Sequence, residues 1–275
     1  MKNYDIVIIG GGISGIYTMY NLKKKFPKLK VLLLEKNERF GGRVYSHYEK
    51  VDNVDYVMDL GAGRIGHHHT LMVNLIKELK LEKFIFNIGN TENYIEFNDK
   101  KNLTIDKSKL RKDYTILLYN FFFSSKIANL SKTLLTKHYL YEILIKFFPK
   151  TIYKFIENSF EYKNKLFHLN AYDAINYFKY DYNNNSKFFI MTNGLSSIID
   201  AMINKIFQNK NYKLKKQSYV TNIIYNNEIS SYNISYKQNN TFYNINCKYL
   251  ICALPKCDLI KFKILNPYLR ELNTI

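Results

Sequence analysis

The stretch DIVIIGGGISGIYTMYNLKKKF, residues 5–26, decides the fold class of this 275-residue chain. An apolar run leads directly into three glycines, and apolar residues then recur at helical spacing. We predict a buried strand over residues 4–9 and a helix over residues 14–25. KVLLLE, residues 30–35, is expected to form a second buried strand. Continuously apolar strands separated by a helix are typical of a parallel sheet in an α/β fold.

Gly10, Gly12 and Gly15 have the spacing G-x-G-x-x-G between the predicted strand and the predicted helix. The first glycine allows a sharp turn, the second lets a pyrophosphate approach the backbone, and the third lets helix and strand pack closely. An anion then lies at the N-terminus of the helix, where N–H groups are free and the helix dipole favours negative charge. Ile13 and Ser14, in the first helical turn, are further candidate contacts.

Glu35 follows Gly15 by 20 residues and ends the second predicted strand. A carboxylate at this position accepts hydrogen bonds from an adenosine ribose and repels a 2′-phosphate, which disfavours NADP. The pattern to this point fits both NAD and FAD. The alternative is an ordinary strand–turn–helix unit with no ligand.

EKNERFGGRVYS, residues 35–46, has the spacing E-x-x-x-R-x-G-G-R. It resembles the second signature of the flavin-dependent amine oxidase superfamily, which includes monoamine and L-amino-acid oxidases. The resemblance implies FAD, and it places Lys36, Arg39, Gly42 and Arg43 beside the cofactor. We expect the FAD to be non-covalent, because no cysteine lies in a late motif for covalent flavin attachment. Arg43 is suited to balance the pyrophosphate charge.

Three further stretches carry the same resemblance. DLGAGRI, residues 59–65, is similar to the family's loop under the flavin ring, and its expected cofactor contacts are Gly61, Ala62, Gly63 and Arg64. TNGLSSIIDAM, residues 192–202, resembles the helix that re-enters the FAD domain. Val220 lies in a stretch that resembles the adenine-side strands, where the family binds adenine through backbone atoms.

The expected fold is therefore α/β, with a Rossmann-like FAD-binding domain of the GR2 type and an inserted, mostly helical substrate domain. Further helices are expected near residues 69–80, 108–123, 138–157, 170–179 and 194–208. Strands are expected near residues 54–60 and between 218 and 253, with turn signals at NNE (226–228) and NN (239–240). The expected segments are residues 1–85 and 187–255 for the FAD domain, 86–186 for the insertion, and 256–275 for the start of a further segment.

The resemblance implies oxidation of a primary or secondary amine or an L-amino acid, by hydride transfer to flavin N5 with oxygen as acceptor. Arg64 matches the position at which L-amino-acid oxidases carry an arginine that binds the substrate carboxylate. It could equally pair with a nearby acid or with the cofactor. His67, His68 and His69 begin a predicted helix and would point in different directions, so we expect no metal site there.

The chain carries 41 Lys+Arg against 23 Asp+Glu, a formal net charge of +18. This excess indicates either a partner such as nucleic acid or a membrane surface, or simply a lysine-rich composition. The lysines are scattered, and Lys23, Lys24 and Lys25 suit the end of the first helix. We therefore favour composition alone and expect no nucleic-acid partner.

Cys247, Cys252 and Cys257 form no C-x-x-C pair, which favours free thiols and a cytoplasmic, reducing environment. No apolar stretch reaches the roughly 20 residues of a transmembrane helix.

Family members resembling this chain continue into a C-terminal segment that contacts the flavin ring, and no glycine follows Gly194 here. We thus expect a truncated family member, or a chain completed by a second polypeptide. A degenerate protein that binds FAD or a partner without catalysis is the alternative.

Overall fold

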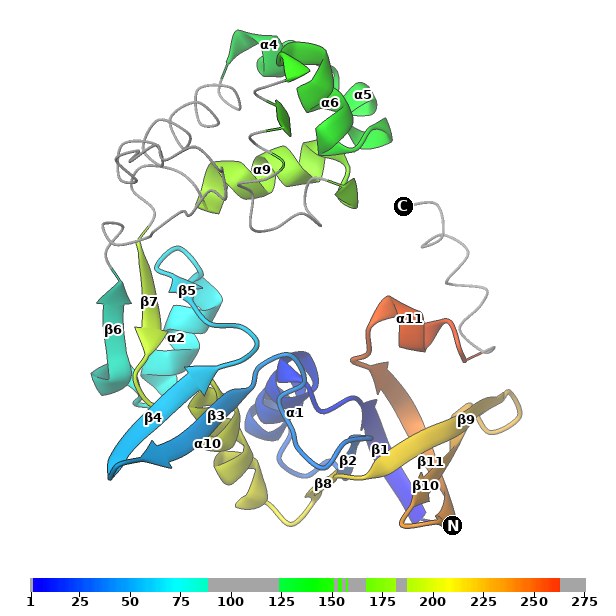
Figure 1. Ribbon diagram of the computed structural model, residues 1–275. Helices are drawn as coiled ribbons and strands as arrows, with labels where there is room; N and C mark the ends of the chain where they lie inside the picture. The colour runs from blue at the N-terminus through cyan, green and yellow to red at the C-terminus, as the bar shows by residue number, and fades with distance from the viewer. Residues whose placement is uncertain are drawn as a thin grey trace. The chain divides into compact units, whose positions relative to one another are not determined.

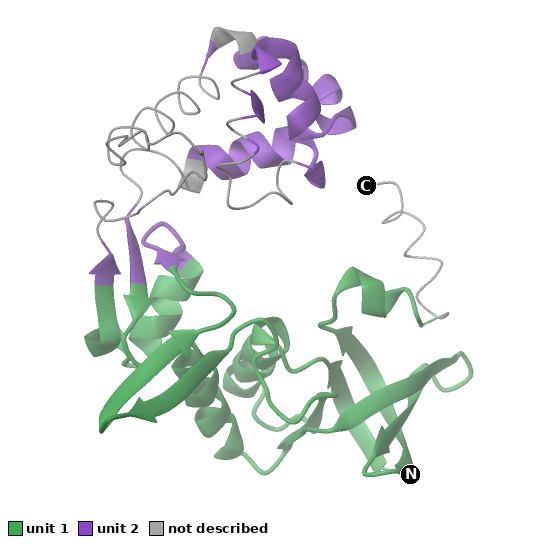
Figure 2. Cartoon of the chain, in the orientation of Figure 1, with its two compact units in different colours: residues 1–64, 71–86, 190–275 green, residues 65–70, 87–189 purple. Residues whose placement is uncertain are grey.

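The computed structural model describes residues 2–88, 124–150, 153–154, 157, 167–181 and 187–262. The chain divides into two compact units (Figure 2). The first unit comprises residues 1–64, 71–86 and 190–275, and the second comprises residues 65–70 and 87–189.

The first unit contains a six-stranded sheet with the strand order β8-β2-β1-β11-β10-β9 (Figure 1). Strands β8, β2, β1 and β11 are parallel to one another, whereas β10 pairs antiparallel with both β11 and β9. The strands are β1 (Lys2–Ile9), β2 (Val31–Leu34), β8 (Tyr212–Lys215), β9 (Ser218–Asn226), β10 (Ser231–Gln238) and β11 (Thr241–Cys252). The predicted α/β fold with a parallel sheet is confirmed.

Helices α1 (Ile13–Lys25) and α10 (Ser196–Phe207) pack against each other in this unit. α1 begins directly after the glycine turn and buries Ile16, Met19 and Tyr20. α2 (Thr70–Glu78) is tied to α1 by the Tyr20 hydroxyl, which donates to Glu78 Oε1 at 2.7 Å. These helices lie close to the expected ranges 14–25, 194–208 and 69–80.

The core of the sheet combines its parallel and antiparallel halves. Side chains from β1 and β2 pack with side chains from β9, β10 and β11 in one cluster. The cluster includes Val7, Ile9, Leu32, Leu34, Val220, Ile223, Ile234 and Ile245. The hairpin between β10 and β11 turns through Asn239 and Asn240, both with positive φ, which is typical of a two-residue type I′ turn. The NN turn signal in the sequence is therefore confirmed.

Most of the shorter strands were not predicted from the sequence. β3 (Ser46–Val51) and β4 (Val54–Asp59) form a separate hairpin, and only β4 matches an expected strand. A third sheet has the order β5-β7-β6, made of β5 (Ile65–Gly66), β7 (Phe188–Met191) and β6 (Ile85–Ile88), the last preceded by the 3₁₀ turn η1 (Glu82–Phe84). β3, β5, β6, β7 and β8 are too short or too polar to give a periodic pattern.

The second unit contains α4 (Ser125–Ala128), α5 (Lys132–Lys137), α6 (Leu140–Phe147) and α9 (Ala171–Asp181). Its core includes Leu140, Ile143, Leu144, Ala174 and Phe178. The expected helix 138–157 is wrong in length, because α6 ends at Phe147 and Phe148 is extended (φ −116°, ψ 142°). Pro149 follows, and a residue before proline is pushed out of the helical region. The expected helix 108–123 lies outside the described residues.

Two features are absent from the described part of the chain. No helix there is long and apolar enough to cross a membrane. No group of three or more His, Cys, Asp or Glu side chains there is placed to hold a metal ion.

Candidate cofactor-binding site

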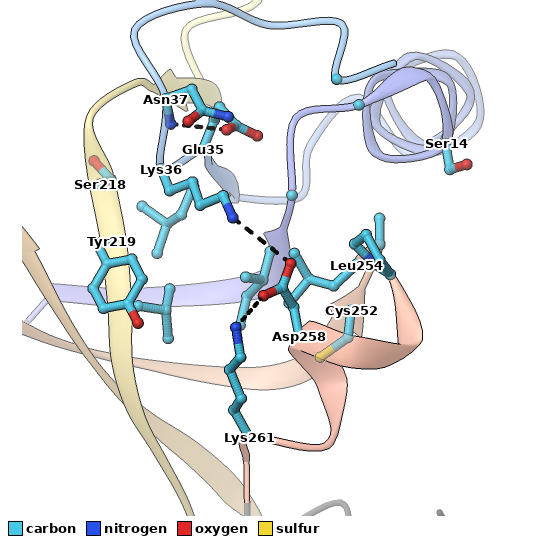
Figure 3. Close-up of a pocket in the computed structure, with 18 of the residues that line it drawn as sticks. Ser14, Glu35, Lys36, Asn37, Ser218, Tyr219, Cys252, Leu254, Asp258 and Lys261 are labelled. Atoms are coloured by element: carbon cyan, nitrogen blue, oxygen red, sulfur yellow. Dashed lines mark hydrogen bonds and ion pairs between the residues drawn. The ribbon is translucent and has the colours of Figure 1, made fainter. Parts of the chain in front are cut away.

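A cavity of about 570 Å³ lies in the first unit, at the carboxyl ends of parallel strands β1, β2 and β11 (Figure 3). Ligands of open α/β sheets bind at this edge. Of the predicted cofactor contacts, the cavity is lined by Gly10, Gly12, Ile13, Ser14, Glu35, Lys36, Gly42, Arg43 and Val220. The other predicted contacts are not part of its lining: Gly15, Arg39, Gly61, Ala62, Gly63 and Arg64.

The three motif glycines meet different surroundings. Gly10 has φ +104°, and a Cβ atom there would lie 2.4 Å from Ala253 O. A Cβ atom on Gly15 would lie 2.0 Å from Gly10 O, so close packing of helix and strand requires this glycine. A Cβ atom on Gly12 would meet no protein atom nearer than 3.9 Å. Protein packing therefore explains Gly10 and Gly15, whereas no close protein contact requires glycine at position 12, where the bare backbone lines the cavity.

The first turn of α1 faces the same cavity. Gly12 is its N-cap, no side chain caps it, and its first turn contains no acidic residue. The first N–H groups of a helix have no partner within the helix and carry partial positive charge. This end of α1 is therefore suited to an anionic group such as a pyrophosphate.

Glu35 is buried at the end of β2, where only 6% of it is exposed. Its Oε2 atom accepts from the Gly11 N–H at 2.7 Å, and its Oε1 atom accepts from the Asn37 N–H at 2.8 Å. A carboxylate has about four acceptor positions, so two remain for ribose hydroxyls. The two backbone donors also fix the carboxylate against the glycine turn.

Arg39 stabilises the second glycine turn and does not line the cavity. Its guanidinium donates to Gly42 O at 2.7 Å and to Val44 O at 3.2 Å, and it lies 4.3 Å from the centre of the Tyr45 ring. Gly42 has φ +61° and approaches Gly12 so closely that a Cβ atom would lie 3.1 Å from Gly12 Cα. Arg39 thus shapes the turn that presents Gly42 and Arg43 to the cavity.

The loop with Gly61, Ala62 and Gly63 is attached to this same turn. The Ala62 N–H donates to Arg43 O at 3.0 Å, and a Cβ atom on Gly61 would lie 2.1 Å from that oxygen. The loop therefore touches the backbone of the second motif without lining the cavity. Arg64 is exposed at the end of the loop.

Val220 lies next to an irregularity in β9, an edge strand of the sheet. The pairing with β10 shifts between Ser235 and Tyr236, so that Thr221 has no opposite residue. A β-bulge of this kind bends a strand and leaves backbone groups outside the ladder. Val220 thus lines the cavity directly beside this bulge.

The predicted contacts omit several cavity-lining residues of β9, of the end of β11 and of the segment that follows it, although two of these stretches resemble the adenine-side strands. The omitted residues are Ser218, Tyr219, Thr221, Cys252, Ala253, Leu254, Pro255, Asp258, Lys261 and Phe262. Asp258 lies on the single-turn helix α11 (Lys256–Leu259), within the expected further segment 256–275. The one available signal was Pro255 at the end of an apolar strand, which indicates that the chain turns there.

Asp258 joins two lysines at the cavity (Figure 3). Its carboxylate lies 2.6 Å from Lys261 Nζ and 3.6 Å from Lys36 Nζ. The hydrogen bond from Lys261, with Lys36 nearby, lowers the pKa of the Asp258 carboxyl. Exposed ion pairs of this kind add little to the stability of the fold. Asp258, Lys36 and Lys261 therefore matter mainly because they set the charge of the cavity wall.

Two cysteines differ sharply in expected reactivity. Cys252 lines the cavity, and burial raises its pKa to about 11, whereas Cys257 is exposed. The thiolate is the nucleophile, so we expect iodoacetamide at neutral pH to modify Cys257 at least about tenfold faster than Cys252. Peptide mass spectrometry over time checks this, with Cys257→Ser as the control. Equal rates would contradict the burial of Cys252.

The family model described as flavin containing amine oxidoreductase matches residues 13–267. The chain belongs to this family. The family is one of flavin-containing amine oxidoreductases, so membership implies a flavin cofactor.

The chain matches its curated relatives over less than half of their length. A probable flavin-containing monoamine oxidase A of Dictyostelium discoideum is 36% identical over 98 residues, which cover 36% of this chain and 20% of that protein. Amine oxidase A of Bos taurus is 39% identical over 86 residues, covering 31% of this chain and 15% of the relative. The uncharacterised protein R188 of Acanthamoeba polyphaga mimivirus is 26% identical, covering 76% of this chain and 47% of that protein.

The fold is similar to that of putrescine oxidase. A structure of that enzyme bound to putrescine aligns with a TM-score of 0.58 and 17% identity, covering 92% of this chain. The chain spans 58% of the putrescine oxidase chain. At this identity the likeness concerns the fold alone.

Proposed function

We propose that the chain binds FAD non-covalently in the cavity and oxidises a primary or secondary amine or an L-amino acid. The observation that carries the proposal is the combination at the first glycine turn. A Cβ atom on Gly12 would meet no protein atom nearer than 3.9 Å, no side chain caps the N-terminus of α1, and Glu35 holds a carboxylate with free acceptor positions beside them.

Each part of the cavity receives a part of the ADP moiety in this proposal. The pyrophosphate lies against Gly12 and the first turn of α1, with Arg43 balancing its charge. The ribose hydroxyls donate to Glu35, and the adenine meets the backbone at Val220. Asp258 keeps Lys36 and Lys261 partly neutralised, so that the adenosine end of the cavity is not strongly cationic.

A bound flavin accepts a hydride from the carbon next to the substrate nitrogen, and oxygen then reoxidises the reduced flavin. The residues of this chain hold the cofactor and orient the substrate. We propose that the second unit, with the segment 86–186, forms the substrate domain. We also propose that Arg64 binds a substrate carboxylate, because a planar guanidinium donates two parallel hydrogen bonds to a carboxylate. The other hypothesis is that Arg64 pairs with an acid or with the cofactor.

Arg64→Met separates these two hypotheses. If Arg64 binds a carboxylate, the substitution lowers kcat/KM for L-amino acids by about 100-fold and leaves simple amines within about threefold, because a bidentate charged contact is lost only for amino acids. A peroxide assay with matched amine and amino-acid pairs measures the difference. Arg64→Lys is the control, since it keeps the charge without the fork. An equal loss for both substrate classes would exclude the carboxylate role.

Reconstitution with FAD tests the proposal directly. The purified chain, stripped of flavin, is expected to bind FAD in equilibrium dialysis and to release it on acid denaturation, as a non-covalent cofactor does. NADP should not compete, because Glu35 repels the 2′-phosphate. A chain that takes up no FAD under these conditions would overturn the proposal.

Turnover decides between the enzyme and the non-catalytic alternative. FAD binding with peroxide production from an amine or amino acid supports the oxidase. If FAD binds but neither amines nor amino acids reduce it, the alternative is supported. The chain is then a family member that binds FAD or a second polypeptide and has no catalytic activity on its own.

A further inference from the structure

The structure brings together two lysine-rich segments that lie far apart in the sequence. Residues 23–30 and 205–213 contain eight lysines and no acidic residue. The two segments interlock, because Lys23 Nζ bonds to Lys205 O and Asn209 Nδ2 donates to Pro27 O at 2.9 Å. The Tyr212 hydroxyl adds a third link, to Phe26 O at 2.8 Å. Lysines that are scattered along the chain thus gather at one end of the first unit.

Two aromatic side chains protrude at the same end. Phe26 follows the last turn of α1 and is 53% exposed, and Phe207 ends α10 and is 59% exposed. Lysines flank both of them. We define the basic–aromatic face as Lys25, Phe26, Lys28, Phe207 and Lys210, all of which are exposed.

The helix dipole explains only part of this charge. Cations in the last turn of a helix are stabilising, which accounts for Lys23, Lys24 and Lys25 on α1 and for Lys205 on α10. Lys28 and Lys210 lie beyond the helix ends and receive no such benefit. Among the described residues, two acidic groups at this end have partners: Glu78 pairs with Lys24, and Asp5 accepts from the Lys30 N–H. The face as defined contains no acid.

The basic–aromatic face lies at the opposite end of the parallel strands from the cavity. α1 returns the chain to the start of β2, and α10 returns it to the start of β8, so residues 26–30 and 208–211 are at the amino ends of these strands. The cavity is at the carboxyl ends. A large partner on this face therefore leaves the cavity open.

We propose that the basic–aromatic face docks the chain onto an anionic lipid surface. Lysines near such a surface are attracted by its negative potential, and exposed aromatic rings enter the boundary between headgroups and acyl chains. Single-stranded nucleic acid is the other polyanion that lysines and aromatics bind, but it needs a groove that tracks the backbone. Phe26 and Phe207 instead protrude at helix ends, which suits shallow insertion into a flat surface.

Vesicle sedimentation with the full chain tests the proposal. The chain should bind vesicles of phosphatidylcholine with phosphatidylserine at least about tenfold more tightly than vesicles of phosphatidylcholine alone. Lys28→Glu/Lys210→Glu should weaken binding to the anionic vesicles by at least about tenfold. Phe26→Ser/Phe207→Ser should bind at low salt and dissociate at a salt concentration that the unmodified chain withstands, because insertion is not screened.

The matched control is Lys137→Glu/Lys146→Glu, which makes the same change in net charge at exposed helix ends of the second unit. It should retain vesicle binding within about twofold. Thermal unfolding of each variant checks that the fold is kept. The proposal is overturned if the control loses as much binding as the face variant, since only net charge would then matter. It is also overturned if the face variants lose binding to single-stranded RNA while they bind vesicles like the unmodified chain.

Discussion

Gly12→Ala is expected to fold normally and to lose FAD. The added Cβ atom meets no protein atom within 3.9 Å, and Gly12 has φ −72°, which alanine adopts without strain. The methyl group occupies the space where a pyrophosphate would approach the first turn of α1. Loss of one or two charge-assisted hydrogen bonds corresponds to about 3 kcal/mol, or roughly 100-fold in affinity. Equilibrium dialysis with FAD measures this loss.

The stability of the same variant shows whether the effect is local. Alanine is a poorer N-cap than glycine by about 0.5 kcal/mol, so we expect the melting temperature of the apo protein to fall by less than about 3 °C. Unchanged FAD affinity in a folded Gly12→Ala protein would show that no phosphate lies at this turn. The proposed cofactor site would then be wrong.

Gly15→Ala, the same chemical change three residues later, is expected to disrupt the fold. Its Cβ atom would lie 2.0 Å from Gly10 O, within the backbone of the turn itself. Alanine improves helix propensity by about 1 kcal/mol, but a clash with backbone cannot be relieved by a side-chain rotation. We expect a net loss of at least about 3 kcal/mol in the free energy of unfolding.

Urea unfolding of the apo protein measures this second effect without any contribution from cofactor binding. Gly12→Ala is the matched control, because it adds one methyl group to the same turn. Equal stability of the two variants would show that α1 and β1 are packed more loosely than the structure indicates.

Local pattern was sufficient for the part of the site that is contiguous in sequence. The apolar runs of β1 and β2 predict buried strands, and the glycine spacing with Glu35 predicts the turn, the helix and the acid beside it. These features depend on residues within about 30 positions, where periodicity and turn chemistry act. The α/β fold could therefore be predicted, and the resemblance of E-x-x-x-R-x-G-G-R at residues 35–43 indicated the amine oxidase family.

The remaining wall of the cavity could not be predicted in this way. Asp258, Lys261 and Phe262 follow a strand that pairs with β1 across more than 200 residues, and α11, which carries Asp258, has only one turn. Arg39 illustrates a second limit, because its motif position predicts a cofactor contact, whereas its guanidinium binds the carbonyls of its own turn.

The sequence by itself determined the parallel sheet, the glycine turn and Glu35, because each follows from spacing along one short stretch of chain. The glycine spacing also predicted the separate roles of Gly10, Gly12 and Gly15. Only the tertiary structure decided which other residues close the cavity and where the scattered lysines gather. The physical reason is the same in both cases. Close approach between segments that are distant in sequence is set by the packing of the sheet and its helices, and no local pattern encodes it.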